Sequence, residues 1–212
     1  MKLTKYEHSC VVLEEKGIRL IIDPGEFTKD FGGADNVAAV VVTHVHGDHL
    51  NIEHLQAIVA ANPQVKVFTT QEVTSQWVSP HAVAVKNGME QSVGPFMLRF
   101  YGGLHAEIHS FAPRNQNIGV LVNDAFYYPG DSLDVPDRAI TTLALPAGAP
   151  WLKTGEAIDC MKTINPKVFF RTHDGLLNDR GLATTDRWYQ MASEQFGPAY
   201  KPLSPGDSIE LN

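Results

Sequence analysis

The segment Thr43-His44-Val45-His46-Gly47-Asp48-His49 places four side chains that can bind a metal within six positions. It directly follows Ala38-Ala39-Val40-Val41-Val42, a largely β-branched run that is typical of a buried strand. Gly47 allows the backbone to turn, so the imidazoles and the carboxylate need not face the same way. Neutral imidazole beside a carboxylate favours zinc or a similar dication. A solvated histidine-rich loop is the alternative, and the buried strand before the segment argues against it.

Four ligands on one loop cannot complete two metal sites, so further histidine or carboxylate side chains are expected at the ends of later strands. Three residues meet this expectation: His105 follows a strand ending near 101, Asp131 a strand ending at 128, and His173 a strand ending near 170. The predicted metal-binding residues are therefore His44, His46, Asp48, His49, His105, Asp131 and His173.

The order of the expected elements indicates the fold class. Strands at 2–7, 10–14 and 18–22 open the chain as a meander, and a helix is expected to begin after Asn51, which can cap its first turn. Each half of the chain runs several strands and then helices, which favours an α+β fold with two mixed sheets stacked face to face and helices on the outer faces. We predict a four-layer αββα sandwich that forms one domain over residues 1–212. Further strands are expected at 65–69, 82–86, 96–101, 117–122, 125–128, 143–145, 167–170 and 208–211, and further helices near 71–78, 155–164 and 185–196.

The ordered series His-x-His-x-Asp-His followed by a separated His, Asp and His resembles the metallo-β-lactamase fold superfamily. All seven positions match. The resemblance implies one metal ion on His44, His46 and His105, a second on Asp48, His49 and His173, and Asp131 as the bridge between them.

Three shorter stretches resemble a small branch of that superfamily, which includes L-ascorbate-6-phosphate lactonase and N-acyl-phosphatidylethanolamine phospholipase D. They are His8-Ser9-Cys10, Ile21-Ile22-Asp23-Pro24 and Tyr128-Pro129-Gly130-Asp131-Ser132. The cysteine that replaces the bridging aspartate in many true metallo-β-lactamases is absent, which argues against antibiotic hydrolysis. His46 stands where diiron redox members carry glutamate, which favours hydrolysis over oxygen chemistry.

The predicted function is a metal-dependent hydrolase of a small ester-like substrate: a phosphodiester, a lactone or a carboxylic ester. Two divalent ions, with Zn²⁺ expected and Mn²⁺ or Fe²⁺ able to replace it, would provide a metal-bridging hydroxide as the nucleophile. Asp48 and Asp131 are the predicted catalytic residues. Two alternatives are a ribonuclease Z-like nuclease, against which the short acidic chain argues, and a metal-binding sensor without turnover, against which the complete ligand series argues.

Five further residues are candidates for supporting or substrate-binding roles. Asp23 could orient an imidazole of the histidine loop or simply form the Asp-Pro-Gly turn. His8 and His109 could each protonate a leaving group or be hydrogen-bonded structural histidines. Arg114 could bind a substrate phosphate or face solvent, and Trp151 could form a substrate wall or cover the core.

Composition and charge narrow the range of partners. The formal net charge is −7 over 212 residues, and no basic patch offsets it, so a small-molecule substrate is expected rather than nucleic acid. No apolar run is long enough to cross a bilayer, so no membrane partner is expected and the default compartment is the cytoplasm. Cys10 and Cys160 lie in apolar segments and are expected to be buried free thiols. A homo-oligomer is compatible with this sequence.

Overall fold

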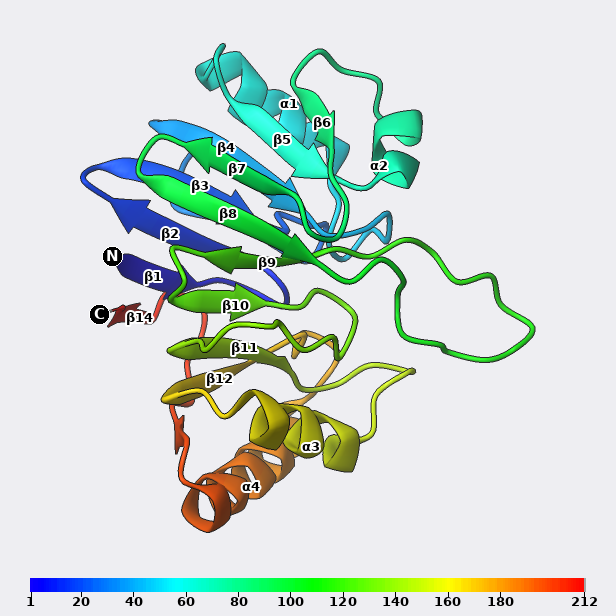
Figure 1. Ribbon diagram of the computed structural model, residues 1–212, viewed down its shortest axis with the longest axis vertical. Helices are drawn as coiled ribbons and strands as arrows, with labels where there is room; N and C mark the ends of the chain where they lie inside the picture. The colour runs from blue at the N-terminus through cyan, green and yellow to red at the C-terminus, as the bar shows by residue number, and fades with distance from the viewer. Residues whose placement is uncertain (212) are drawn as a thin grey trace.

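A computed structural model describes residues 1–211, and Asn212, the last residue of the predicted domain range, lies outside the described residues. Two seven-stranded sheets stack face to face, and Figure 1 shows helices on the outer side of each. The strands are β1 (Lys2–Lys5), β2 (Val11–Glu15), β3 (Ile18–Ile22), β4 (Val37–Val42), β5 (Lys66–Thr69), β6 (Ala82–Ala84), β7 (Glu90–Val93), β8 (Phe96–Tyr101), β9 (Gly119–Val122), β10 (Phe126–Tyr128), β11 (Thr142–Pro146), β12 (Val168–Thr172), β13 (Ala199–Tyr200) and β14 (Ser208–Glu210). The helices are α1 (Ile52–Ala61), α2 (Gln71–Gln76), α3 (Thr154–Ile164) and α4 (Asp179–Phe196).

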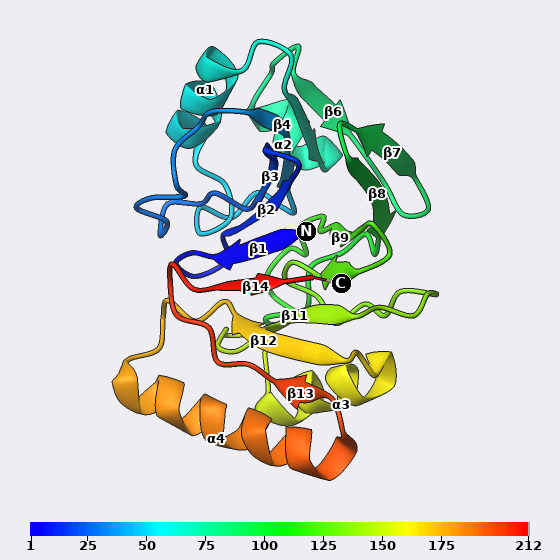
Figure 2. The same ribbon diagram turned by 90° about the vertical axis from the view of Figure 1, so that its left-hand side faces the viewer.

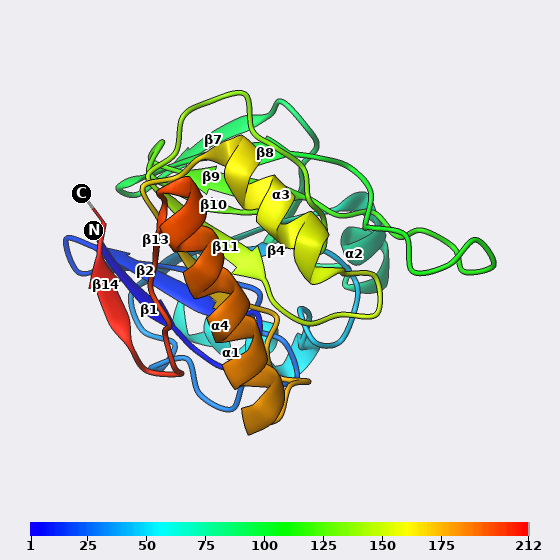
Figure 3. The same cartoon turned by 90° about the horizontal axis from the view of Figure 1, so that it is seen from below.

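Three apolar layers separate these four layers of secondary structure. The central layer lies between the sheets and joins residues such as Leu13 and Val41 of the first sheet to Phe100 and Phe170 of the second. A second apolar layer packs α1 and α2 on the first sheet, and a third packs α3 and α4 on the second. Figure 3 shows α3 and α4 from below, lying over the second sheet. The structure confirms the predicted αββα sandwich.

The directions of the strands decide where the functional loops meet. In the first sheet β1, β3, β4, β5 and β6 all run the same way, and in the second sheet β8 runs the same way as β10, β11 and β12. The loops that follow these strands therefore leave each sheet at one edge. The backbone N–H of Ile118, just before β9, donates to the carbonyl of Thr43, just after β4, at 3.0 Å. This bond joins the loop edges of the two sheets.

The local predictions hold where a sequence signal was strong. Asn51 caps α1 by accepting from the backbone N–H groups of Glu53 and His54. Helix α4 begins at Asp179, six residues before the predicted start, because Asn178 caps it by accepting from the N–H of Gly181. Strands β7 and β13 were not predicted, since the first is polar at an edge and the second has two residues.

The two ends of the described chain lie side by side. Strand β14 pairs antiparallel with β1, and Figure 2 shows the N and C labels close together. Within residues 1–211, no helix is both long and apolar enough to span a membrane.

Candidate metal centre

Two groups of histidine and aspartate side chains meet at the loop edge of the sandwich. In each group, ligand atoms of all four members lie within 4.8 Å of one another. The structure brings all seven predicted metal-binding residues together and adds His8 to them. The first group is His44, His46, His105 and Asp131, and the second is His8, Asp48, His49 and His173.

Asp131 joins the two groups. Its Oδ2 lies 3.3 Å from Nε2 of His105 and 3.1 Å from Nε2 of His173, while its Oδ1 lies 3.1 Å from Nε2 of His49. A single carboxylate therefore contacts ligand atoms of both groups, which is the place that the resemblance assigned to a bridging residue.

Hydrogen bonds on the far side of the rings determine which nitrogen faces the centre. Nδ1 of His49, His105 and His173 lies 2.6, 2.6 and 2.7 Å from the Asp23 carboxylate, the Ala106 carbonyl and the Gly148 carbonyl, respectively. These oxygens only accept, so each neutral ring carries its proton on Nδ1. Nε2 of each ring is left with a lone pair directed into the centre, as metal binding requires.

Thr43 extends the same arrangement to His44. Its hydroxyl donates to Asp23 Oδ2 at 2.7 Å and lies 3.0 Å from Nδ1 of His44. Because the Thr43 hydroxyl donates its proton to Asp23, its oxygen accepts from Nδ1–H of His44. Nε2 of His44 then has the lone pair, and it lies 3.1 Å from Nδ1 of His46. Thr43 was not among the site residues predicted from the sequence, although its position directly before His44 was an available signal.

Buried atoms without a hydrogen-bond partner test whether these residues fit metal ions. Nε2 of His49, His105 and His173 and Oδ1 of Asp131 are buried and have no such partner. An unpaired buried polar atom costs free energy, and four of them converge here. Nitrogen and oxygen donors in this number and mixture fit divalent cations.

Burial and charge oppose each other in setting the pKa values of these groups. Burial holds the pKa of His44 well below 6.5. Burial also lowers the pKa of His173, but the carboxylates of Asp131 and Asp48, whose oxygens lie 3.1 and 3.3 Å from its Nε2, outweigh burial and raise the pKa to about 9. Burial raises the pKa of Asp131, yet the charge of His49 and the nearby imidazoles of His105 and His173 outweigh burial and hold the pKa well below its usual range. The bridging carboxylate is therefore an anion among imidazoles.

Close backbone packing positions Asp131. Gly130 has φ +64°, and a Cβ there would lie 2.4 Å from the side-chain oxygen of Asn117 and 2.8 Å from the Cβ of Thr43. That Asn117 oxygen accepts from the backbone N–H of Asp131 at 3.0 Å. Only glycine fits at residue 130, because both the conformation and the space exclude a side chain.

The five residues predicted for supporting or substrate-binding roles differ in their distance from the metal centre and in their contacts. Asp23 is fully buried and contacts His49, whereas His109 lies on the exposed segment that extends from the sandwich between β8 and β9 (Figure 1). Arg114 donates from Nε and Nη2 to the His105 carbonyl at 2.9 and 2.8 Å. Trp151 donates from its indole N–H to Asp131 Oδ2 at 3.0 Å. His8 lies against Asp48.

Comparison with known proteins gives the family. Residues 2–173 match the beta-lactamase superfamily domain, and the chain belongs to this family. It is 34% identical to protein Rv0786c of Mycobacterium tuberculosis over 182 residues, which is 84% of this chain and 85% of the relative. It is also 31% identical to a UPF0173 metal-dependent hydrolase of Chelativorans sp., over 62% of this chain and 59% of that relative.

Solved structures share the same fold. Igni18, a metallo hydrolase from the archaeon Ignicoccus hospitalis, superposes with a TM-score of 0.75, and the match covers 98% of this chain and 97% of that one at 18% identity. At this identity the likeness concerns the fold alone.

Proposed function

We propose that this protein is a hydrolase of small, uncharged carboxylic esters or lactones that works with two divalent metal ions. One observation carries the proposal: three buried imidazole nitrogens without hydrogen-bond partners lie within 3.3 Å of the Asp131 carboxylate, between the two ligand groups. The proposal takes further support from the family and from the name of the Chelativorans relative.

Two sets of residues would hold the two ions. His44, His46 and His105 would hold one ion and Asp48, His49 and His173 the other, with Asp131 between them. Asp23 and Thr43 hold the imidazoles of His44 and His49 in the tautomer that binds metal. When bound, two divalent ions lower the pKa of a shared water and polarise the oxygen of the scissile group.

The cations near the ligand loops bear on the class of substrate. Arg114 is bonded to the His105 carbonyl, and the buried Lys5 and Arg171 are both paired with Asp174, the residue after His173. The charges of the buried Lys5 and Arg171 are thus paired within the protein, whereas the exposed Arg114 is held on a backbone carbonyl through two of its N–H groups. A phosphate ester is usually recognised by an arginine or lysine whose charge is unpaired, so the pairing of the two buried cations favours an uncharged ester or lactone over a phosphodiester.

The test compares turnover of a panel of lactones and p-nitrophenyl carboxylic esters with turnover of bis(p-nitrophenyl) phosphate. Metal content is measured on the same samples, for the wild type and for His46→Ala and Asp131→Asn. His81→Ala is the matched control, because His81 directly precedes β6 and so lies at the opposite edge of the first sheet.

We expect close to two metal equivalents and ester or lactone turnover in the wild type and in the His81 variant. Both site variants should lose turnover by at least about 100-fold, because loss of a ligand should cost no less than the upper end of the about 10- to 100-fold loss that is typical when a partner of a ligand is removed. Less than half an equivalent of metal in the wild type after incubation with zinc, manganese and iron would overturn the proposed centre. Preferential cleavage of the phosphodiester would overturn the substrate class and leave the centre intact.

A further inference from the structure

His8 occupies an unusual position beside the second group of ligands. It lies in the turn between β1 and β2, is 1% exposed and adopts a left-handed backbone conformation with φ +56°. Its Nε2 is 3.0 Å from Oδ2 of Asp48. By proximity alone it could be counted as a fourth ligand of an ion bound by Asp48, His49 and His173.

The far side of the His8 ring excludes that role. The backbone N–H of Gly175 donates to Nδ1 of His8 at 3.0 Å. An amide N–H can only donate, so Nδ1 is the unprotonated nitrogen and the ring proton is on Nε2. This tautomer is the opposite of the one found in His49, His105 and His173, whose Nδ1 atoms face oxygen acceptors. The nitrogen of His8 that faces the centre therefore has a proton and no free lone pair.

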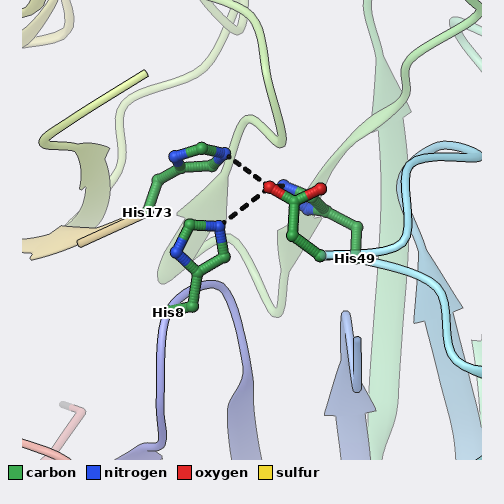
Figure 4. A group of neighbouring side chains, drawn as sticks. His8, His49 and His173 are labelled. Atoms are coloured by element: carbon green, nitrogen blue, oxygen red, sulfur yellow. Dashed lines mark hydrogen bonds and ion pairs between the residues drawn. The ribbon is translucent and has the colours of Figure 1, made fainter. Parts of the chain in front are cut away.

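We propose that His8 is a positioning residue for the second metal ion. His8 donates its Nε2–H to Oδ2 of Asp48 and does not itself bind the ion. Figure 4 shows His8 and His173 approaching one carboxylate oxygen from two sides. His173 Nε2 is 3.3 Å from this oxygen and is a ligand atom, so His8 supplies the hydrogen bond that remains when an ion is bound. The proposal rests on the proposed two-metal function.

The neighbouring residue holds the backbone of the same aspartate. The hydroxyl of Ser9 donates to the carbonyl oxygen of Asp48 at 2.7 Å. His8 and Ser9 thus hold the carboxylate and the main chain of Asp48 together. Nδ1 of His8 has no proton to give, and the Nε2–H of this buried ring is bonded to Asp48. The same bonds therefore also argue against the alternative role of a leaving-group acid.

His8 also joins Asp48 to the ligand loop of the second sheet. Its carbonyl oxygen accepts from the backbone N–H of His173 at 3.0 Å, and its ring accepts from Gly175. A Cβ at Gly175 would lie 3.0 Å from Nδ1 and 3.1 Å from Cβ of His8, so a side chain there would displace the ring. Through these contacts, one turn fixes ligands from two sheets relative to each other.

Two substitutions distinguish His8 as a hydrogen-bond donor to Asp48 from His8 as a metal ligand. In His8→Gln the side-chain amide reaches the position of Nε2 and keeps an N–H for Asp48, although it loses the acceptor for Gly175. In His8→Asn the side-chain oxygen takes the place of Nδ1 and keeps the Gly175 bond, while the donor to Asp48 is lost. Each variant loses one of the two ring contacts, so they are controls for each other.

Zinc titration by calorimetry, with metal content from elemental analysis, gives the affinity for each of the two ions. We expect His8→Asn to bind the second ion about 10- to 100-fold more weakly and the first ion as the wild type does. His8→Gln should remain within about threefold of the wild type for both ions, because the donor is kept. Gly175→Ala should weaken binding of the second ion as His8→Asn does, because the added methyl group would displace the His8 ring.

The outcomes distinguish this proposal from the proposed function. Loss of the second ion in both His8→Gln and His8→Asn would make His8 a ligand and overturn the proposal. Wild-type affinity in His8→Asn would overturn it as well. Failure of the wild type itself to bind two ions would instead contradict the proposed function. Thermal unfolding of the metal-free variants checks folding. If His8→Asn fails this check, Gly175→Ala replaces it. If His8→Gln fails, ¹⁵N NMR of His8 in the wild-type protein with zinc decides instead: a proton on Nε2 supports the proposal, and its loss on zinc binding overturns it.

Discussion

The indole N–H of Trp151 donates to Oδ2 of Asp131 at 3.0 Å, and the ring lies edge-on to those of His105 and His173. Trp151 was expected from the sequence to form a substrate wall or to cover the core. In the structure its indole contacts the carboxylate that joins the two ligand groups. A hydrogen bond to one oxygen of a bridging carboxylate restricts how that carboxylate can rotate.

Trp151→Phe should therefore weaken metal binding without unfolding the protein. Phenylalanine keeps most of the buried apolar surface and removes the N–H donor, so we expect about a 10-fold loss of metal affinity. Competition with a chelating zinc indicator measures this. Trp188→Phe, on the exposed face of α4, is the matched control and should behave as the wild type. Equal affinities in the two variants would show that the indole bond does not support the centre.

Asp23→Asn should impair the centre through the imidazole tautomers. Asp23 accepts from the backbone N–H and the hydroxyl of Thr43 and from Nδ1 of His49, at 2.7, 2.7 and 2.6 Å. An amide cannot accept all three bonds, so the proton of His49 is no longer held on Nδ1. We expect metal affinity or turnover to fall about 10- to 100-fold, measured by zinc titration and initial rates. Asp35→Asn, at an exposed position, should leave both unchanged. If Asp23→Asn also kept wild-type metal affinity and turnover, the role of Asp23 would be limited to forming the Asp-Pro-Gly turn.

The metal-free protein should lose stability as the pH rises from 6.5 to about 9. The pKa of His173 lies near 9 in the folded protein and near 6.5 when unfolded, so the stability that its protonation contributes is complete below 6.5 and disappears as the pH passes 9. The pKa of His49 is raised in the same direction, by Asp131 and Asp23 against the effect of burial. His8, His44 and His46 have lowered pKa values because of burial, and their effect is confined to pH below 6.5.

Thermal unfolding across this pH range, with a chelator and with zinc, is the measurement. The melting temperature should fall with pH only in the chelator series, since bound metal replaces the protons on His49 and His173. A flat chelator series would contradict the assigned pKa directions.

Lys5→Met should destabilise the fold near the His173 loop. Lys5 is fully buried, and its Nζ lies 3.1 Å from Oδ1 and Oδ2 of Asp174. Removing the ammonium leaves the buried Asp174 carboxylate with Arg171 as its remaining partner. We therefore expect the free energy of unfolding to fall by an amount near the lower end of the range typical of a broken buried ion pair, which is about 3–5 kcal/mol. Urea unfolding measures the change, and Lys2→Met, at an exposed position of the same strand, should change stability by less than about 0.5 kcal/mol. A similar loss in both variants would assign the effect to β1 rather than to the ion pair.

The sequence alone was sufficient for features that depend on neighbouring residues. The apolar run of β4, the cap at Asn51 and the density of ligands in residues 44–49 are local signals, and they predicted the strand, the helix and the metal-binding segment. The αββα arrangement followed from the order of elements. Parallel strands deliver their following loops to one edge, and this is why His105, Asp131 and His173 could be expected to meet the His44 segment.

The roles of His8, Trp151 and Arg114 depended on the tertiary structure. His8 meets Gly175 across 167 residues of chain, and Trp151 reaches Asp131 from another loop. Neither contact has a sequence pattern, because it depends on which loop edges face each other and on left-handed backbone conformations such as those of His8 and His173, with φ of +56° and +54°. The sequence by itself determined which residues could bind metal. Only the folded chain decided which of their protons and lone pairs face the candidate metal centre, since hydrogen bonds between distant segments set the tautomer of each ring.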